Sequence, residues 1–148
     1  RRLEWKGRRK GIDVWDDYGH HPTEILATLK ALRARNAGRR LVTLFQPHRF
    51  TRTRCLWDQF ASAFSLSDEV WLSDIYAAGE QPEPGVTAEE LVDAMVAKGQ
   101  AARFAGTLDE ARSGILPQLR ENDVFLTLGA GDVGEVGEAF LSEERPIS

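Results

Sequence analysis

The stretch IDVWDDYGHHPTEI, residues 12–25, decides the fold expected of this chain. It begins with an apolar run, continues through acids, a tyrosine and two histidines, and then reaches Pro22. The apolar run predicts a buried strand, and proline suits the first turn of a helix, where its missing N–H is no loss. We therefore predict a strand over 12–17, a polar turn over 16–22 and a helix after it.

The rest of the chain repeats this strand–turn–helix pattern. Apolar runs at 41–46, 69–75 and 124–128 predict further buried strands, and shorter strands are expected at 4–6 and 103–105. Strand runs that are apolar rather than strictly alternating are typical of a parallel sheet covered on both faces. The predicted class is α/β: a Rossmann-like domain with a mostly parallel sheet and helices on both faces.

Two helices outside the opening stretch carry specific expectations. After the turn at 46–53 we expect one helix with Leu56, Phe60 and Phe64 on its apolar face. A later helix meets Pro117, which predicts a kink or a break because proline lacks the donor that a helix interior needs.

Composition limits the possible functions. The 148 residues are 42% hydrophobic and 28% charged, which is ordinary for one globular domain. No apolar run approaches the ~20 residues of a membrane helix, and a net charge of −4 argues against nucleic-acid binding. The single cysteine, Cys55, cannot form an internal disulfide. We expect a cytoplasmic protein with no membrane or nucleic-acid partner.

Four unusual turns follow predicted strands, at 16–22, 46–53, 74–80 and 129–134. In an open α/β sheet, ligands bind beyond the carboxyl ends of the strands. We therefore expect the four turns to surround a single ligand cleft.

The first turn holds Asp17, His20 and His21. Asp17 could accept hydrogen bonds from ribose hydroxyls, or it could cap the following helix. A metal site that also uses Asp16 and His48 is not favoured, because adjacent side chains tend to point apart and no cysteine partner is present. A histidine that orients a substrate or takes a proton from an amine is favoured instead.

The second turn places Arg49 and Arg52 three residues apart, with Arg54 close behind. Guanidinium groups form paired hydrogen bonds with carboxylates and phosphates, which indicates an anionic ligand. Simple surface basicity is the alternative. We favour a function because cations at the positive end of a helix lack compensation by its dipole.

The third and fourth turns carry weaker signals. The acids of 74–80 could steady an arginine or a ligand, or belong to a plain loop. Gly129, Gly131 and Gly134 form a G-x-G-x-x-G pattern, but a dinucleotide fingerprint also needs a second strand, for which residues 135–148 leave no room. We expect these glycines to permit a tight turn and close packing. The sequence contains no Gly-x-x-x-x-Gly-Lys-Ser/Thr phosphate loop, so a nucleotide would be shared with another domain.

Four stretches resemble the C-terminal domain of the Mur ligases, both in their residues and in their order along the chain. They are DDYGHHPTEI (16–25), LFQPHRFTRT (44–53), DIYAAGE (74–80) and LGAGDVG (128–134). The resemblance covers nearly the whole chain and implies that residues 1–148 are the third domain of such an enzyme. An N-terminal UDP-sugar domain and a central ATPase domain would precede it, with residues 1–10 near the junction.

The resemblance also implies a reaction in peptidoglycan precursor synthesis. ATP, with Mg²⁺, phosphorylates the carboxylate of UDP-N-acetylmuramate, and the amine of L-alanine attacks the acyl phosphate at the inter-domain cleft. Because the central domain would hold most of the ATP and Mg²⁺, this domain alone is expected to be inactive. Tyr18 and the doubled His20-His21 favour the L-alanine-adding member. A murein-peptide recycling ligase and a stand-alone nucleotide-binding regulatory module remain alternatives.

Residue roles follow from the same resemblance. Asp17 is implied to bind the ribose of ATP, and Arg2 to contact phosphate. His20 is the implied catalytic group, and no metal ligand is expected. The residues implied to line the L-alanine site, with the arginines facing its carboxylate, are Tyr18, His20, Arg49 and Arg52.

Overall fold

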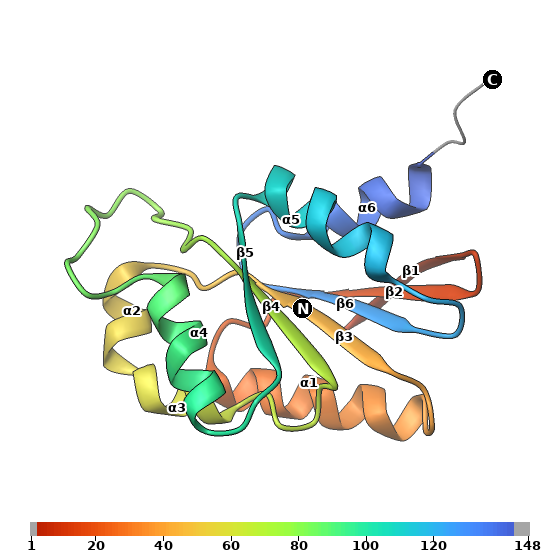
Figure 1. Cartoon of the computed structure of the whole chain (residues 1–148), viewed down its shortest axis with the longest axis horizontal. Coiled ribbons are helices and arrows are strands. Elements are labelled where there is room, and N and C mark those ends of the chain that lie inside the picture. Colours follow the sequence, from red (N-terminus) through yellow and green to blue (C-terminus); the bar gives the residue numbers. More distant parts are fainter. Residues whose placement is uncertain (1–2, 144–148) are drawn as a thin grey trace.

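A computed structural model describes residues 3–143 and contains a six-stranded sheet with helices on both sides (Figure 1). The strands are β1 (Glu4–Arg9), β2 (Ile12–Asp17), β3 (Leu41–Phe45), β4 (Glu69–Ser73), β5 (Ala102–Gly106) and β6 (Val124–Leu128). The helices are α1 (Pro22–Arg35), α2 (Phe50–Cys55), α3 (Trp57–Ser62), α4 (Ala88–Ala97), α5 (Leu108–Ile115), the 3₁₀ helix η1 (Leu116–Gln118) and α6 (Gly134–Ser142).

The strand order across the sheet is β1-β2-β6-β3-β4-β5. Only β1 runs antiparallel to its neighbour; the other adjacent strands are parallel. In Figure 1, α5 and α6 lie on one side of the sheet, and α1, α3 and α4 lie on the other. The predicted α/β class, with a mostly parallel sheet and helices on both faces, is confirmed.

Each face of the sheet has its own apolar core. Successive side chains of a strand point to opposite faces, so Leu41 and Phe45 of β3 join one cluster while Val42 and Leu44 join the other. The first cluster includes apolar side chains of α1, α3 and α4, and the second those of α5 and α6. Burial on both faces explains why the strand runs are apolar throughout.

The register of the parallel strands aligns their carboxyl ends. Asp17 of β2 and Phe45 of β3 both pair with Leu128 of β6, and Phe45 also pairs with Leu72 of β4. The turns that follow these four strands therefore begin side by side at one edge of the sheet. This confirms that the four turns singled out in the sequence meet there.

The structure differs from the sequence prediction at two places along the chain. The segment expected as one helix is two, α2 and α3, separated at Leu56, whose backbone angles (φ −112°, ψ 22°) leave the helical region. From the second helix, Phe60 packs against the ring of Phe45 at 5.5 Å between centroids. β1 is longer than the expected 4–6, and the chain turns at Lys10 and Gly11. The predicted break near Pro117 is confirmed, since α5 ends before it.

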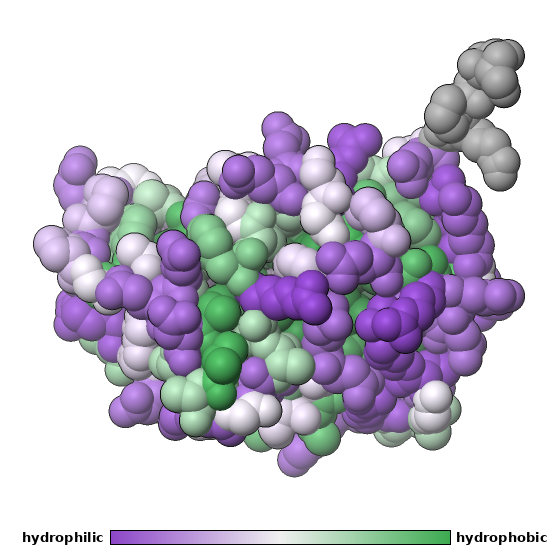
Figure 2. All heavy atoms as spheres, in the orientation of Figure 1, coloured by the Kyte–Doolittle hydropathy of each residue, from purple (hydrophilic) through white to green (hydrophobic). Residues whose placement is uncertain are grey.

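Much of the visible surface in Figure 2 is hydrophilic, with a narrower hydrophobic strip between α4 and β5. β5 is an edge strand, and its Arg103 places a guanidinium 5.1 Å from the ring centroid of Trp71. A charged side chain on an edge strand hinders pairing with another sheet. Among residues 3–143, every helix is too short or too polar to cross a membrane.

A charge network fastens β1 to β2. Asp13 is 4% exposed, accepts hydrogen bonds from Trp5 Nε1 (3.0 Å) and Arg8 Nε (3.0 Å), and forms an ion pair with Arg39 Nη1 (2.8 Å). Burial alone would raise the pKa of Asp13. The hydrogen bonds from Arg8, Trp5 and Arg39 outweigh burial and lower that pKa from 3.8 to about 2.

Replacement of Asp13 by asparagine is expected to lower the free energy of unfolding at neutral pH. Because the folded pKa is depressed, the charged carboxylate contributes stability above about pH 4, and this contribution disappears as pH falls toward 2. A depression of this size corresponds to about 2 kcal/mol. In urea unfolding, the difference between wild type and Asp13→Asn should shrink by that amount between pH 5 and pH 2. A difference that does not change with pH would contradict this, and Asp93→Asn, an exposed carboxylate, is the control.

Candidate functional site

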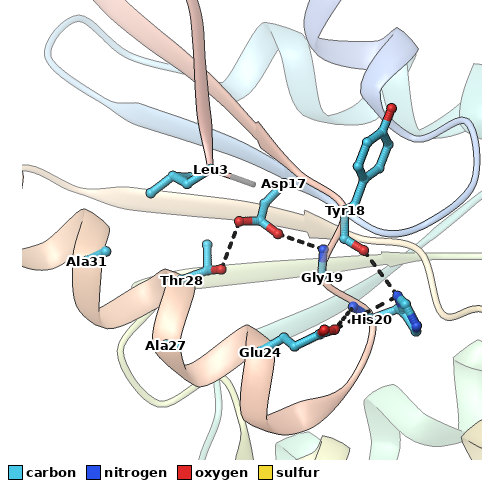
Figure 3. Close-up of a pocket in the computed structure, with 9 residues that line it drawn as sticks. All are labelled: Leu3, Asp17, Tyr18, Gly19, His20, Glu24, Ala27, Thr28 and Ala31. Carbon is cyan, nitrogen blue, oxygen red and sulfur yellow. Dashed lines mark hydrogen bonds and ion pairs between the residues drawn. The ribbon is translucent and has the colours of Figure 1, made fainter. Parts of the chain in front are cut away.

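A hollow of about 500 Å³ lies beside the carboxyl end of β2 (Figure 3). Asp17, Tyr18 and His20 line its polar part. The apolar side chains that line it are Leu3, Ala27 and Ala31. A concave site with an apolar wall and a few converging polar groups is the usual form of a small-molecule site.

Asp17 is buried and holds the turn that follows it. Its Oδ1 accepts a hydrogen bond from the backbone N–H of Gly19 (2.6 Å), and its Oδ2 accepts one from Thr28 Oγ1 (3.0 Å), as Figure 3 shows. It does not cap α1, so that alternative is wrong. Each carboxylate oxygen can accept a second hydrogen bond, which leaves Asp17 able to bind a ligand hydroxyl.

His21 has a structural role that the sequence reasoning missed. It is the N-cap of α1: its Nδ1 accepts from the N–H of Thr23 (3.1 Å), and Glu24 Oε1 accepts from the N–H of His21 (3.2 Å). This reciprocal pair is a capping box. The sequence signal for this N-cap was a glutamate three residues after His21, with Pro22 between them.

His20 is oriented by the turn itself. Its Nδ1 lies 3.1 Å from the carbonyl oxygen of Tyr18, which can only accept a hydrogen bond (Figure 3). Nδ1 therefore carries the hydrogen in the neutral ring, and Nε2 keeps the lone pair. An imidazole in this form can take a proton at Nε2.

Arg49 begins the second turn in an unusual backbone conformation. Its φ of 74° and ψ of 139° are rare for a residue with a side chain and cost ~1–3 kcal/mol. Its N–H donates to the carbonyl oxygen of Tyr76 (2.8 Å), so the turn after β4 holds the turn after β3. Strain of this kind is maintained only where surrounding contacts enforce it, and it often marks a functional site.

Glu80 provides a further anchor for the second turn. Its Oε1 accepts from the N–H groups of Phe50 (2.6 Å) and Thr51 (3.1 Å), and its Oε2 lies 4.0 Å from Arg49 Nη1. Hydrogen bonds from Thr51 are the main cause of a lowered pKa for Glu80. The interpretation that an acid of the third turn steadies an arginine is confirmed for Glu80. The premise that this helix start lacks dipole compensation is wrong, because Glu80 supplies it.

His48 connects the first turn to the second. Its ring stacks on Tyr76 (5.4 Å between centroids, 14° between planes) and lies 5.8 Å from the ring of His20. Arg52 Nη1 lies 3.3 Å from His48 Nδ1. Burial is the largest cause of a lowered pKa for His48, and the charge of Arg52 adds to it. Arg52 is thus joined to His20 through His48, whereas Arg49 and Arg52 do not line the hollow beside Asp17.

The fourth turn packs closely against its neighbours. A β-carbon on Gly131 would lie 2.5 Å from Gln46 Oε1, and one on Gly134 would lie 2.9 Å from Asp16 Oδ1. The expectation of close packing at these glycines is confirmed. Beside them a second hollow of about 460 Å³ includes Asp74 and Tyr76 in its lining, so the four turns do not enclose a single cleft among residues 3–143.

The expectation that Arg2 contacts phosphate stays a prediction. Arg2 lies outside the described residues. In the described part of the chain, no three side chains of His, Cys, Asp or Glu gather as a metal site. We assign Mg²⁺ no step on this domain.

Comparison with known proteins gives a consistent result. Residues 1–131 match the family described as "Mur ligase, glutamate ligase domain". The chain is 50% identical over 143 residues to UDP-N-acetylmuramate–L-alanine ligase of Bdellovibrio bacteriovorus, covering 97% of this chain and 31% of that protein. It thus spans about a third of the length of the curated relatives it matches.

Two solved structures are similar at 30% identity. UDP-N-acetylmuramate–alanine ligase of Thermotoga maritima has a TM-score of 0.73, covering 94% of this chain and 28% of that one. A domain of a putative UDP-N-acetylmuramate:L-alanyl-γ-D-glutamyl-meso-diaminopimelate ligase from Haemophilus ducreyi has a TM-score of 0.71, covering 95% and 98%.

Proposed function

The chain belongs to the Mur ligases, as their glutamate ligase domain, and from this premise we propose that it forms the amino-acid site of a ligase joining L-alanine to UDP-N-acetylmuramate. The relative at 50% identity carries the name of that activity. Since the chain covers 31% of that relative, the activity would need the UDP-sugar and ATPase domains as well. ATP as a co-substrate would place the reaction in the cytoplasm.

One observation carries the assignment of the amino-acid site. Arg52, His48 and His20 form a continuous row next to the hollow that Asp17 and Tyr18 line. A guanidinium is suited to a carboxylate, and an imidazole nitrogen with a lone pair is suited to an ammonium group or to its proton. A small amino acid has both groups a few ångströms apart. We assign its carboxylate to Arg52, with Arg49 beside it, and its amine to His20.

The hollow suits the ribose end of ATP. Asp17 presents a carboxylate with one partner on each oxygen, next to the apolar wall formed by Leu3, Ala27 and Ala31. Asp17 would accept hydrogen bonds from ribose hydroxyls, and Arg2 would contact phosphate as the resemblance implies. ATP, when bound, supplies the phosphoryl group that activates a carboxylate. With no phosphate loop in this chain, the ATPase domain would hold the phosphates.

The contribution of this domain is to hold reactants in position. Three reactants that each carry an anionic group must be brought together and kept from water, which the closure of one domain on another achieves. His20 would take the proton that the amine loses on attack, because its Nδ1 is committed to the carbonyl of Tyr18 and its Nε2 is not. The arginines would hold the carboxylate of the incoming amino acid away from the reacting carbon.

A chimera tests this function. Residues 1–148 would replace the corresponding domain of the Bdellovibrio bacteriovorus ligase, and formation of UDP-N-acetylmuramoyl-L-alanine would be measured with phosphate release. We expect activity that depends on L-alanine in the chimera and no ATP turnover by the 148 residues alone. Ligation by the separate chain would contradict the domain assignment. A stand-alone regulatory module would gain support if the chimera were folded but inactive.

A recycling ligase is the second candidate, because the Haemophilus ducreyi domain is also 30% identical. The same chimera separates the two. L-alanine and the tripeptide L-alanyl-γ-D-glutamyl-meso-diaminopimelate would be compared as amine substrates at equal concentration. Preference for the tripeptide would favour the recycling ligase over the L-alanine-adding ligase.

A further inference from the structure

His48 is assigned no group of the substrate in the function proposed above, yet it contacts residues that are. Its ring lies between Tyr76, His20 and Arg52, which come from three different segments. An isolated backbone bridge between His48 and Tyr76 fixes the two residues side by side. The ring is therefore held by main chain as well as by stacking.

The contact with Arg52 determines the chemical form of His48. A guanidinium N–H can only donate, so His48 Nδ1, 3.3 Å away, must offer a lone pair. The hydrogen of the ring is then on Nε2 and the ring is neutral. His20 has the opposite arrangement, with its hydrogen on Nδ1 facing the carbonyl of Tyr18.

We propose that His48 is a positioning residue: as a neutral ring stacked on Tyr76, it holds the guanidinium of Arg52 beside the amino-acid site and releases it when protonated. The consequence of this positioning, a change in affinity for the substrate carboxylate, rests on the proposed function. The contact itself stands on geometry alone. Protonation would replace the lone pair by a second donor and set two cations against each other.

The charges around His48 keep it in the accepting form. Arg52 and Arg49 face it from the second turn and His20 from the first, and Glu80 of the third turn opposes them; Tyr76 is uncharged. Burial and then the cations lower the pKa of His48 below its usual 6.5. The bond to Arg52 is thus present at neutral pH and is lost as pH falls through that lowered pKa. The KM for L-alanine should rise over the same range.

Two substitutions separate the acceptor from the ring stack. His48→Asn keeps an oxygen near the position of Nδ1 but cannot titrate, and His48→Phe keeps the ring but cannot accept. In the chimera, His48→Phe should raise the KM for L-alanine by about tenfold or more, the loss expected for a hydrogen bond to a charged group. His48→Asn should keep it within about threefold and make its rise at low pH smaller than in the wild type. The KM for ATP should not change in either.

The control is His21→Asn, which retains an N-cap and should leave the KM for L-alanine and its pH profile unchanged. Equal increases in His48→Asn and His48→Phe, or an unchanged acid limb in His48→Asn, would overturn the proposal. Either result would show that His48 acts by packing alone.

A second measurement is independent of ligase activity. The ring nitrogens of His48 can be followed by ¹⁵N NMR in the 148-residue chain. We expect the Nε2–H form with a pKa below the usual 6.5, and a higher pKa for His48 in Arg52→Ala. If the wild-type chimera does not use L-alanine, the proposed function fails while this measurement still decides the contact. A His48 ring of mixed tautomers whose pKa is not lowered would overturn the proposal.

Discussion

Replacement of Arg52 by alanine is expected to raise the KM for L-alanine in the chimera by about 10- to 100-fold. The reason is the loss of a charged hydrogen bond to the substrate carboxylate, worth ~1.5–3 kcal/mol. Because Arg52 lies beside His48 and away from the hollow of Asp17, the KM for ATP should change by less than about twofold. Steady-state kinetics with each substrate varied in turn provides both values.

The matched control for this prediction lies on the same helix. Arg54 is paired with Glu83 at 2.8 Å, and its side chain is half exposed. Arg54→Ala removes an equal charge from α2 without touching His48, so it should leave the KM for L-alanine near the wild-type value. If Arg54→Ala and Arg52→Ala raise this KM equally, the effect comes from the loss of positive charge on α2 in general, and the assignment of Arg52 fails.

Replacement of Asp17 by alanine should have the broader effect. It leaves the N–H of Gly19 and the hydroxyl of Thr28 without their buried partner, at ~1–3 kcal/mol for each group. The turn that carries His20 would relax as a result. We therefore expect lower stability in urea unfolding and higher KM values for both ATP and L-alanine.

Asp17→Asn separates the role of the carboxylate in the fold from its role in ligand binding. Asparagine can still accept from Gly19 and meet the hydroxyl of Thr28, so the turn should persist while the charge is lost. We expect near-normal stability, a near-normal KM for L-alanine and a raised KM for ATP. If Asp17→Asn does not affect ATP, the carboxylate serves the turn alone and the ribose assignment is wrong.

The edge of the sheet at which the site forms could be predicted from the sequence. Apolar runs without alternation indicated a parallel sheet, and the carboxyl ends of parallel strands meet by geometry. The polar turns after β2 and β3 could thus be placed together without knowing the strand order. The side chains of these turns, acids and histidines in one and arginines in the other, could be identified directly from the sequence.

What could not be predicted depends on neighbours distant in sequence. The insertion of β6 between β2 and β3 sets the distance between the first and second turns, and no local sequence pattern predicts this strand order. Glu80 lies 29 residues beyond Thr51, so its capping of α2 was not predicted, and its contact with an arginine could be proposed only as one option. His48 was visible as a histidine in a turn, but its partners Tyr76 and Arg52 became evident only when the turns after β3 and β4 were placed side by side.

The central claim is that Arg52 receives the carboxylate of the amino acid, and a substrate without that carboxylate tests it most directly. The ratio of kcat/KM for L-alanine to that for L-alaninamide would be measured in the wild-type chimera and in Arg52→Ala. We predict that the wild type strongly prefers L-alanine and that this preference falls by about 10- to 100-fold in the variant. The same ratio in both proteins would show that Arg52 does not bind the carboxylate and would contradict the account.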